Sequence, residues 1–152
     1  MLASAVKIML VDDNDGHAEL VKVNLERSGL MNDIIHFSNG RRAIDFLKSL
    51  TSGGEEKKHL MLLDLNMPGM DGLQVLRCMK QNEQTRNIPI IVLTTAGDEE
   101  EVARCYALGC NFYMQKPIEY EVFCGAIREL GLFIRHAKIP GTSMLISQGG
   151  AA

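Results

Sequence analysis

The chain has 152 residues, a length that fits one domain with a sizeable core, and its 46% hydrophobic and 23% charged residues are typical of a globular protein. The net charge of −3, without a Lys/Arg block, argues against direct binding of nucleic acid, which needs a basic surface. The first apolar segment, VKIMLV, is too short for a membrane span or a signal-peptide core and is followed by DDND. We therefore expect a cytoplasmic protein that does not bind membranes.

The hydrophobic pattern alternates between short apolar runs and amphipathic stretches of helical spacing. The first run, VKIMLV (6–11), precedes a helical stretch from about Asn14 to Ser28 that ends on Gly29. Four further pairs, each a strand and then a helix, are DIIHF with NGRRAIDFLKSL (39–50), HLMLLDL (59–65) with GLQVLRCMKQN, IPIIVLTT (88–95) with DEEEVARCYALG, and NFYMQ (111–115) with IEYEVFCGAIRELGLFIRHA. Strands that are apolar on both faces and alternate with helices predict a parallel sheet covered on both sides. The predicted fold class is α/β, a doubly wound five-stranded sheet.

Two segments and the cysteines fall outside this pattern. The polar loop TSGGEEKK (51–58) and the tail from about Pro140, PGTSMLISQGGAA, lack a regular period, and we expect the tail (140–152) to be mobile beyond a domain at 1–139. The cysteines lack the C-x-x-C pairing of zinc or redox sites, which predicts reduced thiols. They are Cys78, Cys105, Cys110 and Cys124.

Polar residues gather where the predicted strands end. Asp64 interrupts the apolar run LMLLDL, and a carboxylate inside a buried strand is costly, so Asp64 should lie at the strand's end and face water or a cation. Asp12 and Asp13 end the first strand, Thr94 ends the fourth, and Lys116 ends the fifth. Ligands of open α/β sheets bind at the carboxyl ends of the strands. We expect these side chains to share one site.

Three clustered carboxylates repel one another, so either one is protonated or a cation neutralises them. Mg²⁺ is usually held by one or two carboxylates together with phosphate oxygens, and Lys116 would balance an incoming phosphoryl group as a point charge. Each residue alone has an ordinary interpretation: DD after a strand is often a helix cap, and Thr94 suits any strand. Their conjunction at four strand ends favours metal-assisted phosphoryl chemistry.

Four motifs resemble the receiver domains of two-component response regulators, the family of the chemotaxis protein CheY. They are VDD (11–13), DLNMPGMDG (64–72), LTTA (93–96) and YMQKP (113–117), and Thr94 follows Asp64 by 30 residues while Lys116 follows Thr94 by 22. The resemblance runs from Lys7 to about His136. It implies a flavodoxin-like fold with strand order 2-1-3-4-5, and a chain that modifies itself without acting as an enzyme on other substrates.

The resemblance also implies roles for individual residues. Asp64 matches the phospho-accepting aspartate. Asp13, Asp64 and the main-chain carbonyl of Asn66 match the Mg²⁺ ligands, with Asp12 contributing through water. Lys116 matches the invariant lysine of the family.

A second group of residues matches the conformational switch of the family. Thr94, not Thr95, matches the switch hydroxyl because only Thr94 keeps the spacing from Asp64 and Lys116. Tyr113 matches the aromatic switch residue, although a plain core aromatic is an alternative. Gly72 matches the glycine that begins the third helix.

The resemblance implies partners as well. We expect no output domain, so the signal would pass to a partner protein or to a histidine phosphotransfer protein. The longer 51–58 loop and the LTT motif resemble those of single-domain regulators partnered with bacterial phytochromes. The expected kinase is therefore a sensor histidine kinase of the phytochrome type. A magnesium-dependent phosphatase and a pseudo-receiver that docks without phosphorylation are the alternatives.

The last predicted helix has an unusually broad apolar face. Its apolar residues fall within an arc of about 140° on a helical wheel, which is wider than a helix needs to cover a sheet. The arc contains Val122, Phe123, Ala126, Ile127, Leu130, Phe133 and Ile134. Either the helix has a broad core face, or part of the arc forms a homodimer interface.

Overall fold

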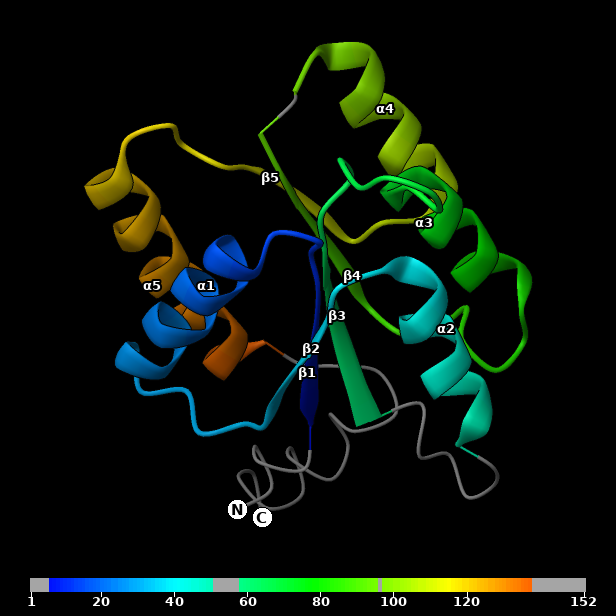
Figure 1. Cartoon of the computed structure of the whole chain (residues 1–152), viewed down its shortest axis with the longest axis horizontal. Coiled ribbons are helices and arrows are strands. Elements are labelled where there is room, and N and C mark those ends of the chain that lie inside the picture. Colours follow the sequence, from blue (N-terminus) through cyan, green and yellow to red (C-terminus); the bar gives the residue numbers. More distant parts are fainter. Residues whose placement is uncertain (1–5, 51–57, 96, 138–152) are drawn as a thin grey trace.

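A computed structural model describes residues 6–50, 58–95 and 97–137 of the chain (Figure 1). Five parallel strands form one sheet in the order β2-β1-β3-β4-β5, as predicted. The strands are β1 (Lys7–Val11), β2 (Ile34–Phe37), β3 (His59–Leu63), β4 (Ile90–Thr94) and β5 (Phe112–Gln115). The helices are α1 (Asp15–Arg27), α2 (Gly40–Ser49), α3 (Gly72–Gln81), α4 (Glu99–Leu108) and α5 (Tyr120–His136). The predictions for residues 51–57, Ala96, the boundary at residue 139 and the tail concern parts of the chain outside the described residues.

Side-chain caps set the starts of the first four helices, and the predictions for α1, α2 and α4 begin one residue early because they include the capping residue. Asn14, Asn39 and Asp98 precede α1, α2 and α4, and each side chain accepts a hydrogen bond from the backbone N–H three residues on. Asp71 and Gln74 form a reciprocal capping box at α3. These caps hold the loops that follow the strands, which is the edge of the sheet where the polar residues gather.

Helices cover both faces of the sheet. Figure 1 shows α1 and α5 on one side and α2, α3 and α4 on the other. Successive strand residues point to opposite faces, so Ile8 and Leu62 pack in the α1/α5 core cluster while Met9 and Leu63 pack in the other. All residues of β3 and β4 are buried, as the apolar runs predicted. None of the helices in the described part of the chain has both the length and the apolar character that crossing a lipid bilayer requires.

Gly72 lets α3 approach the backbone that follows β3. A Cβ atom at this position would lie 2.4 Å from the Cα of Leu65 and 2.5 Å from the carbonyl oxygen of Asp64. Both contacts are with main-chain atoms, which cannot move aside. The first turn of α3 therefore packs directly against the segment that carries Asp64, and Gly72 begins the third helix as the sequence predicted.

We expect Gly72→Ala to destabilise the fold by about 1–3 kcal/mol, because the methyl group would push α3 away from this backbone. Gly125→Ala in α5 is the matched control, since a Cβ at Gly125 has no neighbour within 4 Å. The control should stabilise the protein by up to about 1 kcal/mol, the helix-propensity difference between the two residues. Urea unfolding measures both changes, and a Gly72→Ala variant as stable as the wild type would contradict this packing argument.

Candidate functional site

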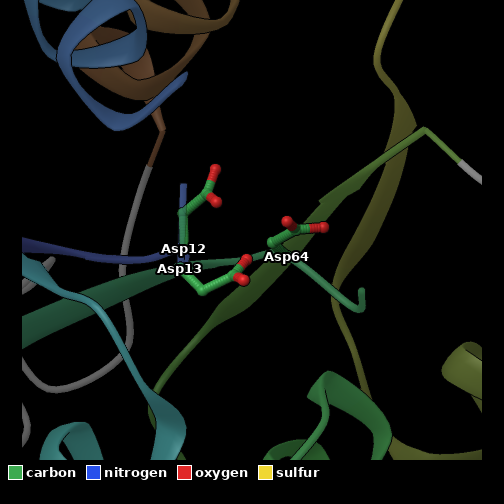
Figure 2. A group of neighbouring side chains, drawn as sticks. All are labelled: Asp12, Asp13 and Asp64. Atoms are coloured by element: carbon green, nitrogen blue, oxygen red, sulfur yellow. The ribbon is translucent and has the colours of Figure 1, made fainter. Parts of the chain in front are cut away.

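Three carboxylates meet at the carboxyl edge of the sheet. Figure 2 shows Asp12 and Asp13, which follow β1, beside Asp64, which follows β3. One oxygen of each carboxylate lies within 4.8 Å of the others. The backbone N–H of Asp64 donates a hydrogen bond to the carbonyl of Val11 at 2.9 Å, so the pairing of β1 with β3 brings the acids together. The sequence predicted this convergence from the ends of the strands.

Lys116 joins this cluster from the far end of the chain. Its Nζ lies 3.1 Å from an Asp12 oxygen and 3.8 Å from an Asp64 oxygen, and its side chain is 3% exposed. The backbone N–H of Lys116 donates to the carbonyl of Thr94 at 2.7 Å, which ties the lysine to the end of β4. A buried ammonium group requires a paired carboxylate, and Asp12 supplies it. Three acids and one lysine leave the cluster with an excess of negative charge, which suits a bound cation.

The environment of Asp64 disfavours its charged form. Burial raises the pKa of this carboxyl above its ordinary value, and the negative charge of Asp12 raises it further. The positive charge of Lys116 and a hydrogen bond from the backbone N–H of Asn66, at 3.2 Å, act in the opposite direction. A cation beside Asp64 would relieve the unfavourable terms. The Asp12–Asp13–Asp64 cluster therefore fits a divalent metal ion by charge, by oxygen chemistry and by proximity.

The side chain of Asn66 connects the segment that follows Asp64 to Thr94. Its Nδ2 donates to the Thr94 hydroxyl at 2.9 Å and lies 3.4 Å from the Thr95 hydroxyl. Thr94 is fully buried, whereas Thr95 is exposed. The sequence predicted a role only for the main-chain carbonyl of Asn66, and only the position of Asn66 two residues after Asp64 would have suggested this side-chain contact.

Tyr113 lies on the same face of the sheet as Thr94 but reaches a different element. It pairs with Val92, two residues before Thr94 on β4, so the three side chains share one face. The half-buried Tyr113 ring packs beside the core, and its hydroxyl donates to Oε1 of Glu101 on α4 at 2.7 Å. Burial and the bond to Glu101 raise the pKa of Tyr113, so the phenol stays protonated. No motif in the sequence marked Glu101, and its only signal was the acidic run that begins at Asp98.

Two histidines that no sequence motif singled out lie near residues of this cluster. The imidazole Nε2 of His36 on β2 lies 2.8 Å from the carbonyl oxygen of Asp12, which can only accept a hydrogen bond. His17 on α1 lines a cavity of 280 Å³ that opens beside Lys116. The other lining residues are Leu20, Thr95, Pro117, Ile118, Tyr120 and Phe123. The cavity leaves a mostly apolar recess next to the charged site.

The strand order and this group of side chains define a receiver domain, and the chain belongs to the response regulator receiver domain family, which it matches over residues 8–128. A receiver domain from Rhodospirillum rubrum is similar in structure, with a TM-score of 0.83 and 43% identity over 89% of this chain and 97% of that one.

Two similar proteins are a metal-bound response regulator and a phytochrome response regulator. The response regulator Rcp1 of Synechocystis is 36% identical over 72% of this chain and 75% of its own length. Its Mn²⁺-bound crystal structure has a TM-score of 0.76 at 30% identity, covering 89% of this chain and 99% of Rcp1. The phosphorylated cyanobacterial phytochrome response regulator RcpA has a TM-score of 0.78 at 26% identity, covering 90% of this chain and 99% of RcpA. Phytochrome-associated regulators are thus among the similar proteins.

The raised pKa of Asp64 makes a prediction about stability. A carboxyl whose pKa is higher in the folded than in the unfolded state stabilises the fold less as pH rises from the unfolded pKa, near 3.8, to the folded pKa. In EDTA at pH 7 we therefore expect Asp64→Asn to melt at a higher temperature than the wild type. The gain should shrink as pH falls through the raised pKa of Asp64.

Thermal melts between pH 4 and pH 7 measure this difference. Asp45→Asn, on the exposed face of α2, controls for the loss of one negative charge. A stability gain of Asp64→Asn that stays constant over the whole pH range would contradict the assignment of the raised pKa to Asp64.

Proposed function

We propose that the chain accepts a phosphoryl group on Asp64 from a phosphohistidine of a sensor kinase. The observation that carries the proposal is a carboxylate, 9% exposed, at the end of a buried strand with a lysine Nζ at 3.8 Å and two further carboxylates beside it. An Asp64 oxygen would form the new bond to phosphorus, while the bond between phosphorus and the imidazole nitrogen breaks and the imidazole leaves. The product is an acyl phosphate, and the chain modifies itself without turnover of a substrate.

Positioning and charge neutralisation supply most of the catalysis in phosphoryl transfer. Asp13, Asp64 and the main-chain carbonyl of Asn66 would hold Mg²⁺, with Asp12 acting through water. The ion, when bound, supplies neutralisation of the negative charge on the transferred group. Lys116 would also neutralise negative charge, because its ammonium lies within reach of Asp64 and would pair with a phosphoryl oxygen. The Mn²⁺-bound structure of Rcp1 supports a divalent ion in this kind of site.

The same site would start a conformational change. A phosphoryl oxygen would attract the Thr94 hydroxyl, Thr94 would move toward it, and Tyr113 would occupy the space that Thr94 leaves. Moving a two-state equilibrium from mostly off to mostly on takes about 5.5 kcal/mol of differential interaction. A few charge-assisted hydrogen bonds to the phosphoryl oxygens are of that size. The altered surface would be formed by α4, β5 and α5.

We infer the partners from the relatives and from the surface beside the site. RcpA is a phytochrome response regulator, which supports a phytochrome-type histidine kinase as the phosphoryl donor, acting in the cytoplasm where kinases find ATP. The apolar cavity beside Lys116 offers a recess for the kinase domain that carries the phosphohistidine. A partner protein or a histidine phosphotransfer protein would then receive the signal.

Incubation with acetyl phosphate and Mg²⁺, followed by intact mass measurement, separates this function from the alternatives. A receiver gains about 80 Da, the mass of one phosphoryl group. A phosphatase would hydrolyse the donor in many turnovers, and a pseudo-receiver would show no change. Continuous turnover without an adduct, or no adduct at all, would overturn the proposed function.

Asp64→Asn keeps the shape of the side chain but removes the nucleophile. We expect the adduct to disappear while the far-UV circular dichroism spectrum stays that of the wild type. Asp13→Asn is a useful comparison, because it retains the nucleophile and should lower the rate without abolishing labelling. Full labelling of the Asp64→Asn variant would mean that another acid is the acceptor.

Millimolar Mg²⁺ should raise the melting temperature, because an ion that binds the folded state stabilises it by mass action. At ten times the dissociation constant the gain is about 1.4 kcal/mol, which raises the melting temperature of a chain of this size by about 3–6 °C. Asp13→Asn should melt higher in EDTA, because the repulsion falls, and should lose the Mg²⁺ effect. Asp15→Asn, exposed on α1, controls for charge. An unchanged response to Mg²⁺ in Asp13→Asn would remove Asp13 from the ligand set.

The apolar face of α5 supports self-association as a further part of the proposal. Phe123, Ile127, Leu130 and Ile134 of the predicted arc are buried in the core, so the core-face interpretation holds for these residues. Val122 and Phe133 remain 53% and 45% exposed. The Phe133 ring packs against Phe112 of β5 with centroids 5.1 Å apart, which makes a continuous apolar surface. We propose that two copies pair through this surface of α5 and β5.

Sedimentation at tens of micromolar, with and without beryllofluoride as a phosphoryl mimic, tests the dimer. Phe133→Glu should yield a folded monomer. Leu132→Glu is the matched control, because Leu132 is similarly exposed on the same helix but lies outside the arc, and it should leave the dimer intact. A wild-type monomer in both conditions would refute pairing through this surface.

A further inference from the structure

The hydroxyl of Tyr113 makes a short hydrogen bond to a carboxylate on α4. It donates to Oε1 of Glu101 at 2.7 Å, and neither side chain is fully exposed. A hydrogen bond to an ionised acceptor is about twice as strong as one between neutral groups. The bond therefore favours the position in which the Tyr113 ring reaches outward to α4, which we call the outward position.

Glu101 is held in place by the start of its helix. Its backbone N–H donates to Oδ1 of Asp98, the N-cap of α4, at 2.7 Å. An acidic side chain in the first turn also interacts favourably with the helix macrodipole. The N-cap of α4 therefore fixes the backbone position from which Glu101 reaches Tyr113.

A second contact ties the backbone of Tyr113 to the same helix. The Tyr113 N–H donates to the hydroxyl oxygen of Tyr106 on α4 at 3.1 Å. This bond involves the main chain, so it can persist when the ring moves. The Glu101 bond involves the end of the ring and is lost when the ring turns inward toward Thr94. Of the two contacts, only the Glu101 bond discriminates between the two ring positions.

We propose that Glu101 is a positioning residue that holds Tyr113 in the outward position and so opposes the change that a phosphoryl group on Asp64 favours. This rests on the proposed function, because the inward movement of Tyr113 belongs to it. A group that stabilises one state weakens the binding of any ligand that prefers the other by the same factor. Glu101 would therefore lower the affinity of the chain for a ligand that favours the inward position of Tyr113.

The first test needs no phosphoryl group. The chain has three tyrosines and no tryptophan, so ring-labelled tyrosine gives a simple spectrum in which Tyr120 is an internal reference. In Glu101→Ala we expect new nuclear Overhauser contacts between the Tyr113 ring and the Thr94 methyl group, and weaker contacts between the ring and α4. Glu101→Gln, which keeps an uncharged acceptor, should fall between this variant and the wild type.

The second test measures beryllofluoride affinity in Mg²⁺. We expect Glu101→Ala to bind about tenfold more tightly than the wild type, equivalent to about 1.4 kcal/mol. Glu100→Ala is the matched control, because it removes the same charge from the same helical turn at an exposed position, and its affinity should stay within about twofold of the wild type. In a Tyr113→Phe background, Glu101→Ala should have little further effect, as a double-mutant cycle requires.

The outcomes separate this proposal from the proposed function. Unchanged Tyr113 contacts and unchanged affinity in Glu101→Ala would overturn the role of Glu101, and so would an equal gain in Glu100→Ala, which would indicate a general charge effect. A wild-type chain that neither binds beryllofluoride nor gains a phosphoryl group would overturn the proposed function instead. The ring contacts of Tyr113 in Glu101→Ala would then still decide whether Glu101 holds the ring outward.

Discussion

The ion pair between Lys116 and Asp12 is the interaction on which the organisation of the site depends. Their atoms lie 3.1 Å apart in a buried environment, and they come from opposite ends of the domain. Neither charge would be tolerated there without the other. The pair therefore requires the end of β5 to lie close to the end of β1, and Asp64 at the end of β3 lies between them. The charge cluster therefore assembles only when β1, β3 and β5 take their places in the sheet.

The environment of Asp64 combines interactions that oppose its negative charge with others that stabilise it. Burial and the negative charge of Asp12 disfavour the ionised form of Asp64. The positive charge of Lys116 and the hydrogen bond from the Asn66 N–H favour it. Such local electrostatic conflict is expected at functional sites and is tolerated because the surrounding core is well packed. Gly72 contributes to this support, since the close approach of α3 braces the backbone at Asp64.

A series of side chains extends from the acidic cluster toward α4 along one face of the sheet. The Asn66 amide contacts Thr94, Thr94 and Tyr113 share a face through the pairing of β4 with β5, and Tyr113 contacts Glu101 of α4. These residues form a series that runs from the segment after β3 to the first turn of α4. This continuity is a physical basis for coupling, whose strength the affinity of the Glu101 variants would measure.

The sequence by itself determined the fold class, the strand order through the family resemblance, and the residues at the ends of the strands. Asp12, Asp64 and Lys116 were found because parallel strands bring their carboxyl ends to one edge, whatever the loops do. Only the tertiary structure decided the contacts of the Asn66 amide, the bond from Tyr113 to Glu101, and which apolar residues of α5 are buried. Those contacts depend on how side chains of separate elements meet, and neither propensity nor periodicity along the chain contains that information.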